Sequence, residues 1–325
     1  MPIELAAAIG RELEGRSRQG LAERAAAISQ TYRAGGTSAR AIGGDDDALA
    51  YALVRMPATF AACAAAFTHT ARRASGFAPR RLTDVGSGPG AASWAALEIW
   101  PGIEAVTQMD ASAPFLTLSH RLAELGPTVL RGAEGLRADV AAKMELPAAE
   151  LVTASYLLAE IAPAAQEGLV ARLWAACEGL LVLVEPGTPA GFERLRAARI
   201  QLIAAGAEIL APCPGQAACP VQAPDWCHFS QRLPRAPDHR AAKQARLSYE
   251  DEKYAYVAAA RPGVREGQAP GRVLSPPRRG KTGVALRLCL PEGIDPQVLV
   301  RRGDPKFAAA RRLEWGDATN DGSAT

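Results

Sequence analysis

Residues 81–90 read RLTDVGSGPG, and this stretch decides the fold. Its first half has the character of a short strand, and its second half carries three glycines, Gly86, Gly88 and Gly90. Glycines at a strand-to-helix junction permit a tight turn, and because they lack a Cβ they let a bound cofactor come close to the backbone. The stretch therefore predicts the first strand and the first loop of a cofactor-binding α/β domain.

Strands and helices alternate along the chain after this loop. We expect further strands at 105–110, 151–155 and 180–185, and helices at 91–99, 114–125 and 166–177. Strands that alternate with helices at this spacing are typical of a parallel sheet with helices on both of its faces. The predicted fold class is α/β, with a Rossmann-like core.

The segments on either side of this core differ from it. The first residues carry apolar side chains at helical spacing, with a long helix expected over 48–74 and interrupted near Pro57. The last third is rich in proline, cysteine and arginine, with short strands expected at 272–274 and 284–290. We expect four parts: a helical region (1–75), the Rossmann-like core (76–204), a Cys-rich basic part completing the sheet (205–318) and a disordered tail (319–325).

The composition is that of a globular protein, since 48% of the 325 residues are apolar and 22% are charged. It excludes fibrous and wholly disordered chains, and a net charge of +3 names no partner. No run of 18 uncharged apolar residues exists, so no membrane partner is expected, and residues 1–4 do not begin a secretory signal. We expect a cytoplasmic protein whose six cysteines form no structural disulfides in a reducing compartment.

The glycine loop fits two classes of cofactor. Asp110 ends the next strand, where a carboxylate can accept hydrogen bonds from the two hydroxyls of a ribose. Read as G-x-G-x-x-A, the loop satisfies the dinucleotide pattern, so NAD is one candidate. Tyr249 and Lys253 add the Y-x-x-x-K spacing of a dehydrogenase proton donor, but the T-G-x-x-x-G-x-G loop of short-chain dehydrogenases is absent.

Read as D-x-G-x-G-x-G, residues 84–90 resemble the first motif of class I S-adenosyl-L-methionine methyltransferases. A carboxylate at Asp84 would repel a pyrophosphate and attract the ammonium group of S-adenosyl-L-methionine, so the sign of the charge favours the methyl donor. A glycine-rich turn that binds no ligand is the remaining alternative. The expected cofactor-binding residues are Asp84, Gly86, Gly88, Gly90 and Asp110.

No motif in the sequence identifies a catalytic base or nucleophile. Residues 155–160 read SYLLAE, where amino-methylating enzymes of nucleic-acid bases often carry Asp/Asn-Pro-Pro followed by an aromatic residue. Cys63 and Cys177 lie in apolar helical runs and lack the Pro-Cys or Thr-Cys context of carbon-methylating pyrimidine enzymes. The catalytic residues are therefore unknown.

Three of the six cysteines, Cys213, Cys219 and Cys227, fall within 15 residues and are flanked by prolines. With Cys289 on a later strand they make four thiolates, which suit a tetrahedral zinc or a [4Fe–4S] cluster. Structural zinc usually has cysteine pairs two to four residues apart, and the wider gaps here favour the cluster. Ligation by His228 in place of Cys289, and three thiols without any metal, are the alternatives.

Residues 228–281 contain twelve basic and five acidic side chains, a net charge of +7. With Tyr249, Tyr254 and Tyr256 interleaved for base stacking, this stretch suits the phosphate backbone of RNA. We expect RNA, and no DNA, as the partner, although an arginine-rich solvated face would have the same composition. The expected RNA-binding residues are Arg272, Arg278, Arg279 and Lys281.

Together these pieces resemble one family, the methyltransferase-like small-ribosomal-subunit assembly proteins of bacteria and mitochondria, called the "ribosomal small subunit protein twenty-two" family. Its most specific segments here are EPGTP at 185–189 and DWCHF at 225–229. The resemblance also covers residues 51–60, the glycine loop, 155–160, 249–253, the Cys289 strand and 315–317.

The resemblance implies S-adenosyl-L-methionine in the glycine loop and a [4Fe–4S] cluster on Cys213, Cys219, Cys227 and Cys289. It also implies action on small-subunit rRNA during ribosome assembly. Three functions stay open: an rRNA methyltransferase, a non-catalytic RNA-binding assembly factor and, third, an NAD-dependent dehydrogenase.

Overall fold

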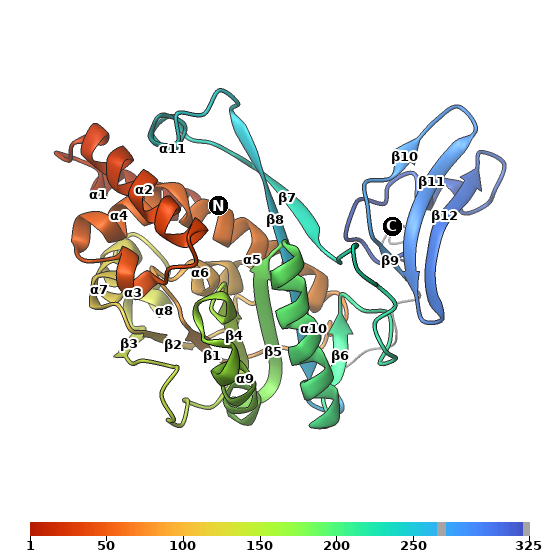
Figure 1. The fold of residues 1–325 in the computed structure, drawn as a ribbon, viewed down its shortest axis with the longest axis horizontal. Helices are drawn as coiled ribbons and strands as arrows, with labels where there is room; N and C mark the ends of the chain where they lie inside the picture. The colour runs from red at the N-terminus through yellow and green to blue at the C-terminus, as the bar shows by residue number, and fades with distance from the viewer. Residues whose placement is uncertain (265–270, 321–325) are drawn as a thin grey trace.

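The computed structural model describes residues 1–264 and 271–320, which form a helix-covered main sheet and a smaller second sheet (Figure 1). The main sheet of the described chain has eight strands in the order β3-β2-β1-β4-β5-β8-β6, with β7 also paired to β8. Its strands are β1 (Arg81–Val85), β2 (Ala105–Asp110), β3 (Glu134–Arg137), β4 (Ala149–Ser155), β5 (Cys177–Pro186), β6 (Glu208–Ala211), β7 (Phe229–Pro234) and β8 (Tyr249–Ala260).

The first five strands of this order are parallel, which confirms the predicted α/β class. Strand β8 runs antiparallel to β5 and to β6. The chain order reverses at β1, because β2 and β4 flank it, and this places the glycine loop at the switch point where α/β sheets bind ligands.

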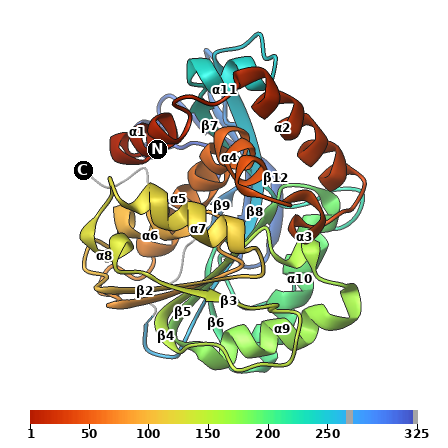
Figure 2. The same cartoon turned by 90° about the vertical axis from the view of Figure 1, so that its left-hand side faces the viewer.

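Helices cover both faces of the main sheet. On one face lie α6 and α7, and on the other α9 and α10 (Figure 2). Alternate residues of β5 face the two cores, since Leu180 and Val182 pack in one cluster and Leu181 and Leu183 in the other. The helices of this part are α6 (Ala91–Ile99), α7 (Ala113–Ala123), α8 (Thr128–Arg131), the 3-10 turn η1 (Leu158–Glu160), α9 (Pro163–Ala176), α10 (Pro189–Ala204) and, between β7 and β8, α11 (Pro237–Ala242).

The N-terminal region is helical, as predicted, and packs on α6, α7 and the β7–β8 edge of the sheet. Its long helix breaks at Arg55, and Pro57 stands in the first turn of the second half, where its missing N–H has no helical acceptor to lose. The helices are α1 (Ile3–Glu12), α2 (Arg18–Arg33), α3 (Ser38–Ala41), α4 (Asp45–Val54) and α5 (Met56–Ala71).

Helices α4 and α5 bear on the question of a membrane span. No single helix of the described residues is long and apolar enough to cross a membrane, and α4 and α5 meet the test only together, bent by 54°.

Strand β8 is the largest difference from the sequence expectation. Its residues Tyr254 and Tyr256 were expected to stack on RNA bases, but each is only 2% exposed and packs against Phe229 in the core. The expectation was wrong because these side chains belong to a strand inside the sheet. Within residues 205–318, strands β6 to β8 belong to the main sheet, whereas β9 to β12 form a separate sheet.

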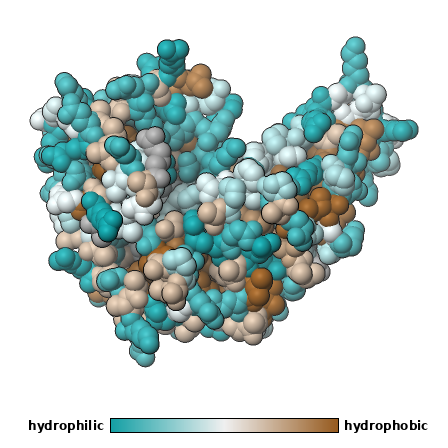
Figure 3. Space-filling view, viewed as in Figure 1, coloured by the Kyte–Doolittle hydropathy of each residue, from teal (hydrophilic) through white to brown (hydrophobic). Residues whose placement is uncertain are grey.

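The remaining C-terminal residues form the second sheet, which has its own small core and projects from the body of the molecule (Figure 3). The predicted tail begins too early, because Thr319 donates its N–H to Gly271 and Asn320 accepts a bond from Arg73; residues 321–325 lie outside the described chain. The elements of this unit are β9 (Arg272–Val273), β10 (Arg278–Arg279), β11 (Gly283–Leu290), β12 (Gly293–Arg301) and α12 (Phe307–Ala310).

Candidate cofactor cleft and cysteine cleft

The glycine loop has a left-handed backbone at all three glycines, with φ of +70° at Gly86, +55° at Gly88 and +89° at Gly90. A Cβ at Gly86 would lie 2.7 Å from the Leu157 side chain, and one at Gly90 would lie 2.6 Å from Gln108, so neither position has room for it. At Gly88 a Cβ would meet nothing closer than 4.0 Å. Gly88 therefore leaves open space above the loop, as a bound cofactor needs.

A cleft opens at the carboxyl ends of β1, β2 and β4, with a volume of about 1580 Å³ that includes its open mouth. We call it the cofactor cleft. Its walls come from the glycine loop, the segments after β2, β3 and β4, and the N-terminal helical region. Its lining includes Ser38, Gly88, Asp110, Arg137, Asp139, Tyr156 and Glu160.

Asp110 lies where the sequence places it, at the end of β2 and in the wall of the cleft. One carboxylate oxygen accepts the N–H of Gly88 and the other that of Ser112, both at 2.8 Å. Burial raises the pKa of this carboxyl, and the two N–H donors oppose the shift. Each oxygen keeps a lone pair, so the carboxylate can still accept from two hydroxyls.

Asp84 does not line the cofactor cleft, and the expectation that it meets the cofactor's ammonium group directly was wrong. Its side chain is fully buried and points to the start of α6, where one oxygen accepts the N–H of Ser93 at 3.1 Å and its hydroxyl at 2.7 Å. The other oxygen has no hydrogen-bond partner among the described residues. Burial raises the pKa of Asp84 to about 7.

The cleft wall is acidic on balance, since Asp110, Asp139 and Glu160 outnumber Arg137. Glu160 accepts the backbone N–H and the hydroxyl of Ser38, both at 2.7 Å, and so ties the N-terminal region to the cleft. Sequence reasoning missed this contact because its partners stand 122 positions apart. No local spacing signals such a pair.

Tyr156 stands at the corner of the cleft where the acceptor motif of base methyltransferases was sought. Its φ of +59° is rare for an aromatic residue and marks local strain. Its hydroxyl donates to Glu252 at 2.8 Å, and Arg55 lies 4.0 Å from the same carboxylate oxygen. The corner is thus filled by a tyrosine whose hydroxyl bonds to Glu252 of β8, and Glu252 in turn lies near Arg55 of the N-terminal region.

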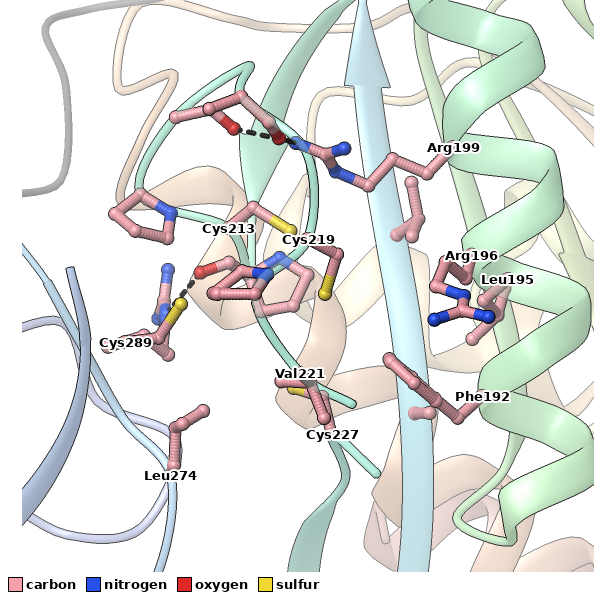
Figure 4. Close-up of a pocket in the computed structure, with 18 of the residues that line it drawn as sticks. Phe192, Leu195, Arg196, Arg199, Cys213, Cys219, Val221, Cys227, Leu274 and Cys289 are labelled. Atoms are coloured by element: carbon pink, nitrogen blue, oxygen red, sulfur yellow. Dashed lines mark hydrogen bonds between the residues drawn. The ribbon is translucent and has the colours of Figure 1, made fainter. Parts of the chain in front are cut away.

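A second cleft brings the four predicted cysteines together, and we call it the cysteine cleft (Figure 4). Cys213 and Cys219 come from the loop after β6, Cys227 precedes β7, and Cys289 enters from β11, where it pairs with Arg272. Their sulfurs face a shared space between α10, β8 and the second sheet. All four thiols are free of disulfides. The pKa of the Cys227 thiol lies well above its ordinary value, mainly because the thiol is buried and secondarily because the other cysteine sulfurs lie nearby.

The four cysteine side chains do not converge on one point where a single metal ion could bind all of them. Among residues 1–264 and 271–320 no three His, Cys, Asp or Glu side chains form a group that could hold one metal ion as they stand. His228 does not line the cysteine cleft, because its ring stacks on Trp226 at 4.9 Å and meets the edge of Trp315.

Two buried arginines line the same cleft. Arg199 donates to the carbonyls of Gly215 and Ala217, and Arg272 donates to those of Pro212 and Gly316. Nε of Arg199 and Nη2 of Arg272 are buried without a hydrogen-bond acceptor in the described chain. A buried guanidinium with spare donors calls for an anion, so the donor set of this cleft fits a negatively charged centre.

The predicted RNA-binding residues divide into two groups. Arg272 is 1% exposed and holds the cysteine loop, so its assignment to RNA was wrong. Arg278, Arg279 and Lys281 are exposed, although Arg279 also pairs with Glu314 at 2.7 Å.

Three of the other basic residues of this stretch form ion pairs within the β7–β8 hairpin. Arg232 pairs with Asp251, and both Arg235 and Lys243 pair with Glu250. The two most specific segments of the sequence also meet, because the Trp226 indole donates to the carbonyl of Gly187 at 3.0 Å.

The sequence of this chain is similar to those of known proteins. A family model described as mitochondrial small ribosomal subunit Rsm22 matches residues 45–320. The mitochondrial ribosome assembly protein METTL17 of Homo sapiens is 31% identical over 289 residues, which cover 83% of this chain and 61% of METTL17. The chain therefore spans less than two thirds of that relative's length.

Solved methyltransferase structures are similar at low identity. The magnesium protoporphyrin IX methyltransferase of Synechocystis, with bound SAM, has a TM-score of 0.41 at 12% identity. The superposition covers 68% of this chain and 85% of that methyltransferase. The ribosomal protein L11 methylase of Lactobacillus delbrueckii has a TM-score of 0.36 at 16% identity, with 61% and 76% covered.

Proposed function

Because this chain belongs to the mitochondrial small ribosomal subunit Rsm22 family, we propose that it is an assembly factor of the small ribosomal subunit that binds its rRNA and S-adenosyl-L-methionine. The observation that carries the proposal is the family match over residues 45–320, since that range contains the glycine loop, Asp110 and all four cysteines of the cysteine cleft.

The charge of the cofactor cleft supports S-adenosyl-L-methionine over NAD. A wall with three carboxylates and one arginine attracts the sulfonium and ammonium groups of the methyl donor and repels a pyrophosphate. In this proposal the Asp110 carboxylate accepts from the ribose hydroxyls, and Gly88 leaves room for the cofactor above the loop. When bound, the cofactor supplies a methyl group on a positively charged sulfur.

We further propose that Cys213, Cys219, Cys227 and Cys289 hold a [4Fe–4S] cluster. Four thiolates around such a cluster leave a net negative charge, which the guanidinium groups of Arg199 and Arg272 would offset. A cube offers four separate iron corners, so its thiolates need not converge on one atom as they must for zinc. The centre would join the loop of the main domain to a strand of the second sheet.

Methyl transfer to rRNA is the reaction that the cofactor would serve. Binding without transfer is the second candidate, and it is favoured by the corner at Tyr156, where a tyrosine bonded to Glu252 replaces the acceptor motif. Small subunits that lack their methyl groups, incubated with labelled S-adenosyl-L-methionine and the protein, separate the two. Label in rRNA supports the enzyme, and bound protein without label supports the scaffold.

Calorimetric titration tests the cofactor assignment. We expect the protein to bind S-adenosyl-L-methionine and not NAD, and Asp110→Asn to weaken binding at least about tenfold, the equivalent of one lost hydrogen bond to a charged group. Glu134→Gln, an exposed change on the neighbouring strand β3, is the matched control and should bind like the wild type. Binding of NAD with no binding of the methyl donor would overturn the assignment.

A further inference from the structure

One end of the second sheet is strongly basic. Residues 278–282 and 301–312 contain six arginines and two lysines against a single acidic residue, Asp304, so the net charge of these two segments is +7. All eight cationic residues are exposed. We call them the basic tip: Arg278, Arg279, Lys281, Arg301, Arg302, Lys306, Arg311 and Arg312.

The two segments form one surface. Gly283 on β11 lies in register with Arg301 on β12, and the N–H of Arg302 donates to the carbonyl of Thr282 at 3.3 Å. Arg279 closes the other side, since its Nε donates to the carbonyl of Arg311 at 3.0 Å. Strand register and hydrogen bonds therefore bring together residues that stand 18 to 32 positions apart.

The positive charge of the tip is only partly used inside the molecule. Arg279 pairs with Glu314, but within the described residues no carboxylate lies at ion-pair distance from Arg301, Arg302 or Lys306. The basic residues of the β7–β8 hairpin behave differently, because Arg232 and Arg235 are each matched by a carboxylate.

We propose that the basic tip is the surface that docks the phosphate backbone of the small-subunit rRNA, an inference that rests on the proposed function. It adds Arg301, Arg302, Lys306, Arg311 and Arg312 to the residues expected from the sequence. The sheet that carries the tip projects from the body (Figures 1 and 3), so it can meet a large folded partner without hindrance from the main domain. A guanidinium group can donate two parallel hydrogen bonds to two oxygens of one phosphate, and six of the eight cations of the tip are arginines. A chain of phosphates such as the RNA backbone can therefore engage several of them at once.

A salt titration of RNA affinity tests the tip. The chain of 325 residues, purified anaerobically, is titrated into a short labelled RNA hairpin of mixed sequence at several salt concentrations. Each phosphate contact contributes about 0.9 to the slope of log affinity against log salt, so R301Q/R302Q should lower the slope by up to about 1.8. The same relation gives an affinity loss of up to about 60-fold at about 0.1 M salt. The matched control is R131Q/K143Q, two exposed cations on the main domain that should change neither value.

The outcomes separate this inference from the proposed function. Wild-type binding with a slope that R301Q/R302Q leaves unchanged overturns the basic tip and keeps the proposed function. No RNA binding by the wild type overturns the rRNA part of the proposed function. Vesicles of anionic phospholipid, titrated in parallel, must bind more weakly than RNA, and stronger tip-dependent binding to vesicles would overturn the choice of RNA.

Discussion

Replacing Arg272 by methionine tests whether the cysteine cleft is built around an anion. Arg272 donates through Nε and Nη1 to two buried carbonyls, each at 2.8 Å, while Nη2 has no acceptor among the described residues. A hydrogen bond from a charged donor contributes about 1.5–3 kcal/mol. With an anionic centre in place, Arg272→Met should therefore lower the free energy of unfolding by about 3–6 kcal/mol.

The same change should matter less in protein from which the proposed cluster has been removed. There the guanidinium is a buried charge without a counter-ion, and its removal relieves a penalty of several kcal/mol that offsets the lost bonds. Urea unfolding of metal-loaded and stripped protein, followed by tryptophan fluorescence under anaerobic conditions, measures both values. Arg196→Met is the control, because Arg196 lines the same cleft but is partly exposed and pairs with Glu193 at 2.6 Å; its effect should stay below about 1 kcal/mol. Equal destabilisation of the loaded and stripped forms by Arg272→Met would refute the reasoning.

Two further substitutions probe β1 and the glycine loop that follows it. The folded pKa of Asp84, about 7, lies above its ordinary value of 3.8, so the folded chain holds this proton more tightly and stability falls as pH rises between the two values. Asp84→Asn cannot ionise, so its free energy of unfolding should rise relative to that of the wild type by about 2–3 kcal/mol as the pH goes from 5 to 8, measured by urea unfolding. If this difference in free energy is the same at both pH values, Asp84 is ionised throughout. Gly88→Ala places a methyl group over the loop at a φ of +55° and should cost only about 1–2 kcal/mol of stability. It should weaken S-adenosyl-L-methionine binding at least about tenfold in calorimetry, whereas unchanged affinity would place the cofactor elsewhere.

The sequence predicts the parts of this fold that depend on local pattern. The glycine loop, the strand that ends at Asp110 and the parallel core follow from spacing and turn chemistry, and the structure has them where they were expected. Strand β8 was missed because residues 255–260 read AYVAAA, and alanine has little strand propensity of its own. Its place between β5 and β6 is set by tertiary pairing.

The side chains that were misjudged depend on contacts across the chain. An arginine within a basic stretch is expected to be exposed, but Arg272 is buried and donates to the carbonyls of Pro212 and Gly316, 60 and 44 positions away. Strand periodicity shows that Asp84 lies on one face of β1 without showing which face, and it lies under α6. The residues alone offered Cys289 as a fourth thiolate, with His228 as an alternative, and the family resemblance implied Cys289; the structure places it in the same cleft as the other three cysteines. A cytoplasmic location stays a prediction.

Iron and sulfide analysis of anaerobically purified protein, read together with its visible spectrum, decides whether the cysteine cleft holds a cluster. We expect a brown protein with about four iron and four acid-labile sulfide per chain and broad absorption near ~400 nm. Cys289→Ser should reduce all three, and Cys63→Ser, a buried thiol on α5 outside the cleft, should reduce none. A colourless protein that carries one zinc ion per chain, or no metal, would contradict the cluster and with it the role assigned to Arg199 and Arg272.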